Sequence, residues 1–163
     1  MFRSSRVSRA FLAASFVALL GVTFLAGCGA VGMGKKSIAL TISASAELNN
    51  CGKASPQPLE FAVIQVTDEK PIAGTSLVQV WAKEKALFGD ALLTRDTGSI
   101  VPGAAKQPFA FQRNAKAKAV IVIGNFCKPD GSCWYATQDL SKGSKLSLEA
   151  GASCLTRVTK KKK

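Results

Sequence analysis

Short segments of alternating apolar and polar residues run through most of the chain after residue 36, and this period-two pattern is typical of half-buried β-strands. Residues 37–45 show it most clearly, because every second position is apolar and the positions between are small or polar. Residues 59–67 are rich in β-branched and aromatic side chains. Residues 47–58 contain Asn, Gly and Pro, so we expect a polar loop between these two strands.

The second half of the chain contains further strand-like segments. They cover residues 98–101, 109–112, 118–126, 133–137, 145–150 and 154–158. Turn signals such as Pro102-Gly103 separate them. Residues 120–123 are all Val or Ile and have no polar face, which indicates a central strand that is covered on both sides.

Residues 74–94 have a helical period instead. Ser76 and Gln79 have the spacing of a capping box, in which each side chain binds the backbone of the other residue. Apolar residues recur at steps of three and four, and Glu84 alone interrupts the stripe. We expect one or two short helices that cover the central strand, with Trp81 and Phe88 buried in the core.

This pattern of seven or eight short strands and one helical insertion favours a single fold class. We expect a mainly β protein, with a two-sheet antiparallel β-sandwich over residues 37–158 and a small helical insertion. The length suits one domain, and 47% hydrophobic residues with nine Phe can form a modest core.

The first residues have the order of an export signal. Three arginines within the first nine residues precede an apolar stretch, residues 10–26, that is short for a membrane-spanning helix. The stretch ends in Leu25-Ala26-Gly27-Cys28, which resembles a bacterial lipobox. The alternative is a plain N-terminal anchor helix with an incidental cysteine. The order of basic region, apolar region and cleavage site favours the export signal over this anchor helix.

The lipobox resemblance implies that residues 1–27 are a lipoprotein signal peptide and that Cys28 becomes the first residue. Its thiol would carry diacylglycerol and its amine a further acyl chain, which together are enough for stable anchoring. Residues 28–36 are small and glycine-rich, so we expect a flexible tether after the lipidated cysteine. Gly29 is not the Asp that keeps many lipoproteins at the inner membrane, so the expected location is the periplasmic face of the outer membrane.

Charge and composition limit the function further. The chain has 163 residues with 22 Lys+Arg, 10 Asp+Glu and no His, which gives a net charge of +12. Without His, no Ser-His or Cys-His nucleophile pair and no imidazole metal ligand can form. The carboxylates are scattered singly in turn or capping contexts. We therefore expect no enzyme activity, no metal and no cofactor besides the covalent lipid on Cys28.

The part of the chain after residue 27 stays basic, because only three of the 22 Lys+Arg precede it. Residues 159–163 are expected to form a basic C-terminal tail, in which Lys160–Lys163 are solvated. No aromatic residue interleaves these lysines, so nucleic acid is not an expected partner. Acidic lipid headgroups or an acidic protein face are favoured.

Four cysteines besides Cys28 fit an oxidising compartment. They are Cys51, Cys127, Cys133 and Cys154, and they allow three pairings. Cys127 and Cys133 bracket a Pro-Asp-Gly turn signal, so we expect these two to pair across a hairpin loop. Cys51 and Cys154 then pair by elimination. A four-thiolate zinc site is the competing interpretation, and it is disfavoured because no two cysteines have the C-x-x-C spacing.

Taken in order along the chain, several segments resemble the TssJ (VasD-type) outer-membrane lipoproteins of bacterial type VI secretion systems. The segments are the lipobox at 25–28, Glu47-Leu48-Asn49, residues 58–63, residues 88–93, Ile100-Val101-Pro102-Gly103, residues 121–124 and the strand around Trp134. Only the lipobox is specific by itself, so the resemblance rests on order and spacing over most of the mature chain. It implies a transthyretin-like β-sandwich with a non-enzymatic role.

The resemblance also implies a partner and a contact site. Such a lipoprotein anchors the periplasmic part of the inner-membrane TssM protein to the outer membrane, and with TssL and TssM it forms the envelope-spanning complex. The TssM contact would involve the loop between the first two strands. Here that loop consists of Leu48, Asn49, Asn50, Cys51, Gly52, Lys53, Ala54, Ser55, Pro56 and Gln57. The four additional cysteines, Tyr135 after Trp134, and the lysine tail depart from the family pattern.

A second function is compatible with the same residues. A cell-envelope lipoprotein would use its basic surface to bind lipopolysaccharide or peptidoglycan. The lysines concerned are Lys116, Lys118, Lys142, Lys145 and the C-terminal run. A solvated, solubilising face is the simpler interpretation, and the alternate positions of Lys116 and Lys118 favour it.

Overall fold

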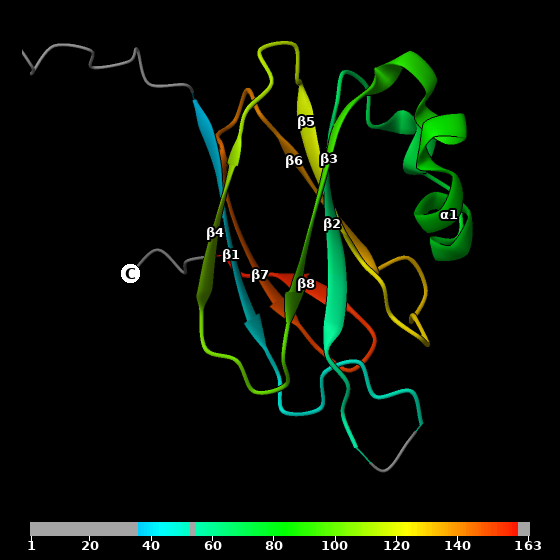
Figure 1. The fold of residues 1–163 in the computed structure, drawn as a ribbon, viewed down its shortest axis with the longest axis vertical. Helices are drawn as coiled ribbons and strands as arrows, with labels where there is room; N and C mark the ends of the chain where they lie inside the picture. Colours follow the sequence, from blue (N-terminus) through cyan, green and yellow to red (C-terminus); the bar gives the residue numbers. More distant parts are fainter. Residues whose placement is uncertain (1–35, 53–54, 160–163) are drawn as a thin grey trace, which may run out of the picture. The chain divides into compact units, whose positions relative to one another are not determined.

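The structure is a computed structural model, and it describes residues 36–52 and 55–159. The expected signal peptide, Cys28, the tether up to residue 35 and Lys160–Lys163 lie outside these residues. In the described part, eight strands and one α-helix form a two-sheet β-sandwich (Figure 1). The expected fold class, mainly β with a small helical insertion, is confirmed.

The elements follow one another in the order that the sequence pattern predicts. The strands are β1 (Ser37–Ala44), β2 (Leu59–Val66), β3 (Leu92–Ile100), β4 (Gln107–Gln112), β5 (Ala119–Gly124), β6 (Tyr135–Asp139), β7 (Lys145–Ala150) and β8 (Leu155–Arg157). Between β2 and β3 lie the short 3-10 helix η1 (Lys70–Ile72), the helix α1 (Leu77–Phe88) and the 3-10 helix η2 (Gly89–Ala91).

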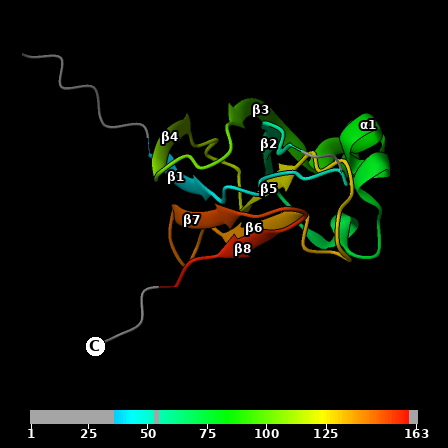
Figure 2. The ribbon, with the colours of Figure 1, turned by 90° about the horizontal axis from the view of Figure 1, so that it is seen from below.

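Each sheet has four strands, in the orders β4-β1-β7-β8 and β3-β2-β5-β6. The two sheets lie face to face, as Figures 1 and 2 show from two directions. Neighbouring strands are antiparallel, except that β1 and β7 are parallel. This pair departs from the purely antiparallel arrangement that we expected. Because they are paired in parallel, both start from the same end of the sandwich.

We name the two ends of the sandwich by the course of β1. The proximal end is where β1 begins, and it also carries residues 113–118 and 140–144. The distal end is where β1 stops. It carries the loops 45–58, 101–106, 125–134 and 151–154. In Figure 1 the proximal end is at the top.

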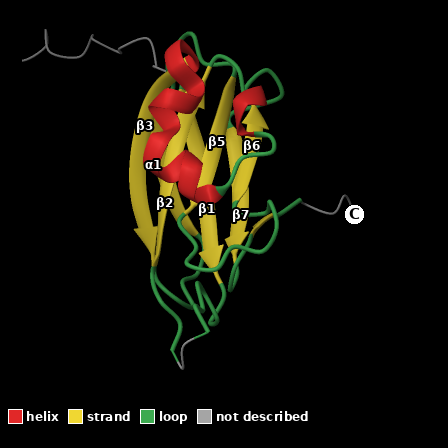
Figure 3. Cartoon of the chain, turned by 90° about the vertical axis from the view of Figure 1, so that its right-hand side faces the viewer, coloured by secondary structure: helices red, strands yellow, loops and turns green. Residues whose placement is uncertain are grey.

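The central strands β2 and β5 are buried on both faces. Phe61 of β2 packs edge to face against Phe109 of the other sheet, with ring centroids 5.0 Å apart. Side chains alternate between the two faces along a strand, so Ile64, three residues after Phe61, points to the outer face of its sheet. Ile121 pairs with Ile64 on β5 and points to the same outer face. The helix α1 covers that face (Figure 3). The apolar run at 120–123 is therefore a central strand with a helical cover, as predicted.

The predicted capping box starts α1. The backbone N–H of Gln79 donates to Ser76 Oγ at 3.4 Å, and the backbone N–H of Ser76 donates to Gln79 Oε1 at 3.0 Å. These bonds satisfy backbone donors that the first turn of a helix leaves without partners. Leu77, Val80 and Phe88 are the buried residues of the helix.

Trp81 is half-buried at the edge of α1, which corrects the expectation that it lies in the core. The guanidinium of Arg95 on β3 lies 5.3 Å from the centre of the indole ring. The Nε atom of Arg95 is 2.7 Å from Glu84 Oε1. Glu84, the single polar residue of the apolar stripe, therefore has a basic partner on the adjacent strand.

Two expected boundaries are wrong. Residues 92–94, which we placed in the helical segment, begin β3 and pair with β2. β3 is an edge strand with exposed or half-buried polar residues at 94–97, so it carries little of the apolar signal that marks a central strand. The strand expected from Cys133 begins at Tyr135 instead, because residues 130–133 bond to residues 153–155.

Candidate partner-binding site at the distal end

The loop between β1 and β2 has a buried base and an accessible tip. Leu48 and Asn49 are 0% and 7% exposed, so they face the protein rather than the solvent. The accessible or half-buried residues are Asn50, Cys51, Gly52, Ser55, Pro56 and Gln57, while Lys53 and Ala54 lie outside the described residues. Of the expected contact residues, Leu48 and Asn49 are thus placed to hold the loop, and a partner can reach only the tip.

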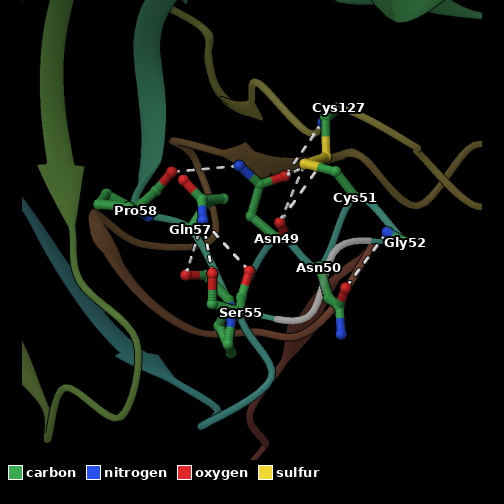
Figure 4. The surroundings of a disulfide bond; sticks show 9 residues. Asn49, Asn50, Cys51, Gly52, Ser55, Gln57, Pro58 and Cys127 are labelled. Carbon is green, nitrogen blue, oxygen red and sulfur yellow. Dashed lines mark hydrogen bonds between the residues drawn. A yellow bond between two sulfur atoms is a disulfide. The ribbon is translucent and has the colours of Figure 1, made fainter.

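Asn49 binds three separate segments of the chain, and Figure 4 shows its contacts with two of them, at Pro58 and Cys127. Its Nδ2 donates to the carbonyl oxygen of Pro58 at 3.1 Å, and its Oδ1 accepts from the backbone N–H of Cys127 at 3.0 Å. Its own backbone N–H donates to the carbonyl oxygen of Gly151 at 3.2 Å. Among the described non-glycine residues it alone has a positive φ, 47°, a conformation that Asn tolerates better than most residues.

Short-range hydrogen bonds shape the tip of the loop. The side-chain amide of Gln57 donates to the carbonyl oxygens of Ser55 and Pro56, both at 3.1 Å. The backbone N–H of Gly52 donates to Asn50 Oδ1 at 3.2 Å, which is a turn stabilised by an Asn side chain. The tip is therefore held by contacts within the loop as well as by its buried base.

Two disulfides join the distal loops, and their pairing differs from the expected one. Cys51 is bonded to Cys127, and Cys133 is bonded to Cys154. All four cysteines that we expected in disulfides are therefore bridged. The expected pairs, Cys127 with Cys133 and Cys51 with Cys154, are wrong.

Long-range hydrogen bonds explain the observed pairing. The backbone N–H of Asp130 donates to the carbonyl oxygen of Ser153 at 3.1 Å, and that of Leu155 donates to the carbonyl oxygen of Cys133 at 2.8 Å. These bonds align residues 130–133 with residues 153–155 and bring Cys133 to Cys154. Asn49 meanwhile holds Cys127 beside Cys51 (Figure 4). The local Pro-Asp-Gly signal contains no information about either contact.

The disulfides and backbone bonds combine the distal loops into one cross-linked layer. Loop 45–58 is joined to loop 125–134 by the first disulfide, and loop 125–134 is joined to loop 151–154 by the second. The loop 101–106 is attached through the N–H of Gly103, which donates to the carbonyl oxygen of Ser45 at 2.9 Å. The tip of the β1–β2 loop is therefore presented on a firm support.

An apolar groove with a volume of about 280 Å³ adjoins this layer. It lies between α1 and the residues that follow β5, and its lining includes Val78, Trp81, Phe126, Cys127 and Pro129. Val78 is 75% exposed, so the groove is open to solvent. The sequence analysis missed it, because the groove exists only where α1 meets a segment far away in the chain.

The described residues contain no arrangement that suggests a metal centre or a membrane span. Within residues 36–52 and 55–159, no group of three or more His, Cys, Asp or Glu is placed to hold a metal ion. None of the helices in this part of the chain has the length and apolar character needed to cross a membrane.

One protein-family model matches the chain. The family is described as "Type VI secretion lipoprotein, VasD, EvfM, TssJ, VC_A0113", and the match covers residues 36–152. This range extends from the residue before β1 to the loop after β7. Among curated proteins, none matches the sequence.

Several solved structures have the same fold. Lip of Serratia marcescens, described as a membrane bound component of the Type VI Secretion System, has 19% identity and a TM-score of 0.68 over 76% of this chain and 97% of that chain. The lipoprotein TssJ1 from Pseudomonas aeruginosa has 14% identity and a TM-score of 0.68 over 80% and 100% of the two chains. A chain in the structure described as "T6SS protein TssM C-terminal domain (869-1107) from EAEC" has 18% identity and a TM-score of 0.63 over 76% and 98%.

Proposed function

Since the chain belongs to the family of type VI secretion lipoproteins that includes VasD, EvfM and TssJ, we propose that it docks the periplasmic part of a TssM protein at the outer membrane. In this role the protein is a lipid-anchored docking module without catalytic activity, and TssL joins the assembly indirectly through TssM. The proposal rests on the β1–β2 loop: its tip is accessible to a partner, and a disulfide joins it to the neighbouring loop of the distal end.

The contact with TssM is assigned to the tip of this loop, residues 50–57. Its buried base and the disulfide from Cys51 hold the described residues of the tip, 50–52 and 55–57, before a partner arrives. A loop that is ordered in advance loses less conformational entropy on binding, which favours affinity. Leu48 and Asn49 contribute by supporting the tip rather than by touching the partner.

The membrane anchor is assigned to Cys28. Residues 1–27 act as the signal peptide, residues 28–36 as the lipidated tether, residues 37–158 as the sandwich and residues 159–163 as the basic tail. The family description as a lipoprotein and the Leu-Ala-Gly-Cys motif at 25–28 support this division. Gly29 after the lipidated cysteine favours the outer membrane. Incorporation of labelled palmitate, lost in Cys28→Ser, tests the anchor.

A pull-down of TssM from envelope extracts tests the docking site. The combined variant Asn50→Ala, Ser55→Ala and Gln57→Ala removes three polar side chains from the tip but keeps the length of the loop, its buried base and the disulfide. We expect it to recover at least about tenfold less TssM than the wild type, because truncation of a few central residues removes most of an interface's affinity.

A matched control changes another distal loop. The variant Ala105→Ser with Lys106→Ala lies in the 101–106 loop, where both residues are exposed. It is expected to recover TssM as well as the wild type does. Equal recovery by the wild type and the tip variant contradicts the loop assignment, and an equal loss in both variants contradicts its specificity.

The alternative function, binding of lipopolysaccharide or peptidoglycan, stays a prediction. One observation favours it: Lys116, Lys118, Lys142 and Lys145 are all exposed at the proximal end. Under this alternative, binding to isolated envelopes falls steeply as salt is raised, because electrostatic contacts are screened. Removal of Lys160–Lys163 weakens it further.

A further inference from the structure

The proximal end carries exposed basic side chains that the docking proposal does not use. Lys36 precedes β1, two lysines precede β5, and two lie between β6 and the start of β7. We call this set the basic pole: Lys36, Lys116, Lys118, Lys142 and Lys145, all of them exposed. The segments that carry them are distant in the sequence, so only the fold brings them to one end.

Hydrogen bonds fix these segments relative to one another. The backbone N–H of Arg113 donates to the carbonyl oxygen of Lys36 at 2.9 Å, and that of Leu140 donates to the carbonyl oxygen of Lys118 at 2.8 Å. The guanidinium of Arg113 donates to the carbonyl oxygens of Leu140 and Ala117, at 3.3 Å and 3.4 Å. The pole is therefore a defined surface rather than a set of independent loops.

The charge of the pole is only partly neutralised. Lys142 Nζ lies 3.8 Å from Asp139 Oδ2, but both side chains are largely solvated, at 80% and 42% exposure, so the pair is weak. The hydroxyl and backbone N–H of Ser141 bind Asp139 and lower its pKa, which keeps this carboxylate ionised. Asp68 and Glu69 are the other acidic residues nearby. In the described part of the chain, the other four lysines of the pole form no ion pair.

The two ends of the sandwich differ in charge as a result. The described residues of the distal loops include two basic residues, Lys106 and Lys128, and two acidic residues, Glu47 and Asp130, so their charges balance. The proximal end has the five lysines of the pole and Arg113 against three carboxylates. Within residues 36–52 and 55–159, the sandwich therefore has a basic end and a nearly neutral end, and β1 begins at the basic one.

We propose that the basic pole rests on the anionic phospholipid headgroups of the leaflet that holds the acyl chains of Cys28. This inference rests on the proposed lipid anchor. The nine residue steps from Cys28 to Ser37 span at most about 30 Å even when fully extended. The pole therefore stays within reach of the headgroups, and this high effective concentration lets weak lysine–phosphate contacts act together.

The contact would orient the molecule. With the basic pole on the membrane, the distal end and its β1–β2 loop point away from the surface, toward a partner that arrives from the periplasm. An anchor on a flexible tether alone gives no such orientation. The pole thus supports docking without touching the docking partner.

Lysine acylation of the lipidated protein on vesicles tests the proposal. The protein is added to preformed vesicles of phosphatidylcholine alone or with phosphatidylglycerol, and the rate at each lysine is followed by mass spectrometry. We expect the pole lysines to react about fivefold more slowly on the anionic vesicles, while Lys106 and Lys128 react equally on both. Raising the ionic strength to about 1 M shortens the Debye length to about 3 Å and should remove the difference.

A matched pair of variants separates the pole from general effects. In Lys116→Gln, Lys118→Gln, Lys142→Gln and Lys145→Gln combined, the remaining Lys36 should lose its protection. In Lys106→Gln with Lys128→Gln, Lys36 should stay protected. The proposal is overturned if Lys36 of the wild type reacts at equal rates on the two vesicle types, or if Lys36 of the fourfold variant stays as protected as in the wild type. It is also overturned if Lys106 and Lys128 are protected on anionic vesicles as strongly as the pole lysines are. A third contrary result is that the pole lysines bind isolated peptidoglycan but are not protected on vesicles.

Flotation distinguishes this proposal from the function on which it rests. If the protein fails to float with neutral vesicles, the lipid anchor is wrong and the proposal falls with it. If the protein floats but the pole lysines are not protected on anionic vesicles, the headgroup contact alone is wrong, and the docking function stands.

Discussion

At the scale of single residues, Asn49 sets the geometry of the candidate site. It is buried, and a buried amide is stable only when its polar atoms find partners. Its side chain donates to Pro58 and accepts from Cys127, a combination that an amide provides and a hydrocarbon or a carboxylate does not. Together with its positive φ, this makes Asn49 the junction between the loop and the rest of the distal end.

The first prediction concerns this junction. We expect Asn49→Ala to lower the free energy of unfolding by about 1 to 3 kcal/mol, because it removes two partly buried hydrogen bonds, one to the carbonyl oxygen of Pro58 and one from the N–H of Cys127. Asn49→Gly loses the same bonds but adopts the positive φ freely, so it should be about 1 kcal/mol more stable than the Ala variant. Urea unfolding measures both values. Equal midpoints for wild type and Asn49→Ala would show that the bonds carry no stability.

Arg95 gives a second prediction at this scale. Its ion pair with Glu84 is partly exposed, with side chains at 33% and 18% exposure, so solvent screens much of the attraction. A double-mutant cycle with Glu84→Gln and Arg95→Gln should give a coupling energy of about 0.5 to 1 kcal/mol. Arg95→Lys keeps the charge that pairs with Glu84 but loses the stacking of the planar guanidinium on Trp81, so it should be about 0.5 kcal/mol less stable than the wild type. A coupling energy of zero contradicts the role assigned to Glu84.

At the scale of elements, the packing of β3 on β2 depends on a glycine. A Cβ atom at Gly98 would lie 2.5 Å from Cζ of Phe61, which packs on Phe109 across the sandwich. The bare backbone at this position therefore leaves room for the ring that joins the two sheets. The edge strand was difficult to recognise from its sequence, yet it has this specific packing requirement.

The third prediction follows from that contact. Gly98→Ala should lower the free energy of unfolding by about 1 to 3 kcal/mol, because the Phe61 ring must move within a packed core. Ser99→Ala, at the exposed neighbouring position on the same strand, is the control and should change stability by less than about 0.5 kcal/mol. Thermal unfolding of the three proteins measures the difference. A Gly98→Ala variant as stable as its control contradicts the close approach of the ring.

At the scale of the whole molecule, the two ends of the sandwich have different properties. The distal end is cross-linked by both disulfides and carries the loop proposed to bind TssM. The proximal end receives the chain from the proposed anchor and gathers exposed lysines. The sandwich lies between them, and its central strands β2 and β5 are buried on both faces.

The fourth prediction concerns the disulfides. Replacement of Cys51 and Cys127 by Ser should lower the free energy of unfolding by about 4 to 5 kcal/mol, since that bridge spans 76 residues. Replacement of Cys133 and Cys154 should cost about 3 kcal/mol, because that bridge spans 21 residues. The first variant should also recover less TssM. Non-reducing peptide mapping checks the pairing, and a peptide that joins Cys127 to Cys133 would contradict the structure.

The sequence by itself determined the features that depend on neighbours along the chain. Period-two alternation identified β1 and β7, the unbroken apolar run identified β5, and the spacing of Ser76 and Gln79 identified the start of α1. These signals are local, because side-chain direction and helix capping repeat over a few residues. The order of the segments was also enough to suggest the family that the match to residues 36–152 shows.

Only the tertiary structure decided which distant residues meet. The pairing of Cys51 with Cys127, the contact of Asn49 with Cys127 and the parallel pair of β1 and β7 all join segments that are far apart in the chain. Local turn signals favoured a pair of Cys127 with Cys133, but hydrogen bonds between residues 130–133 and residues 153–155 place Cys133 beside Cys154. The physical reason is that a contact between distant segments depends on the packing of both sheets, and no short stretch of sequence contains that packing.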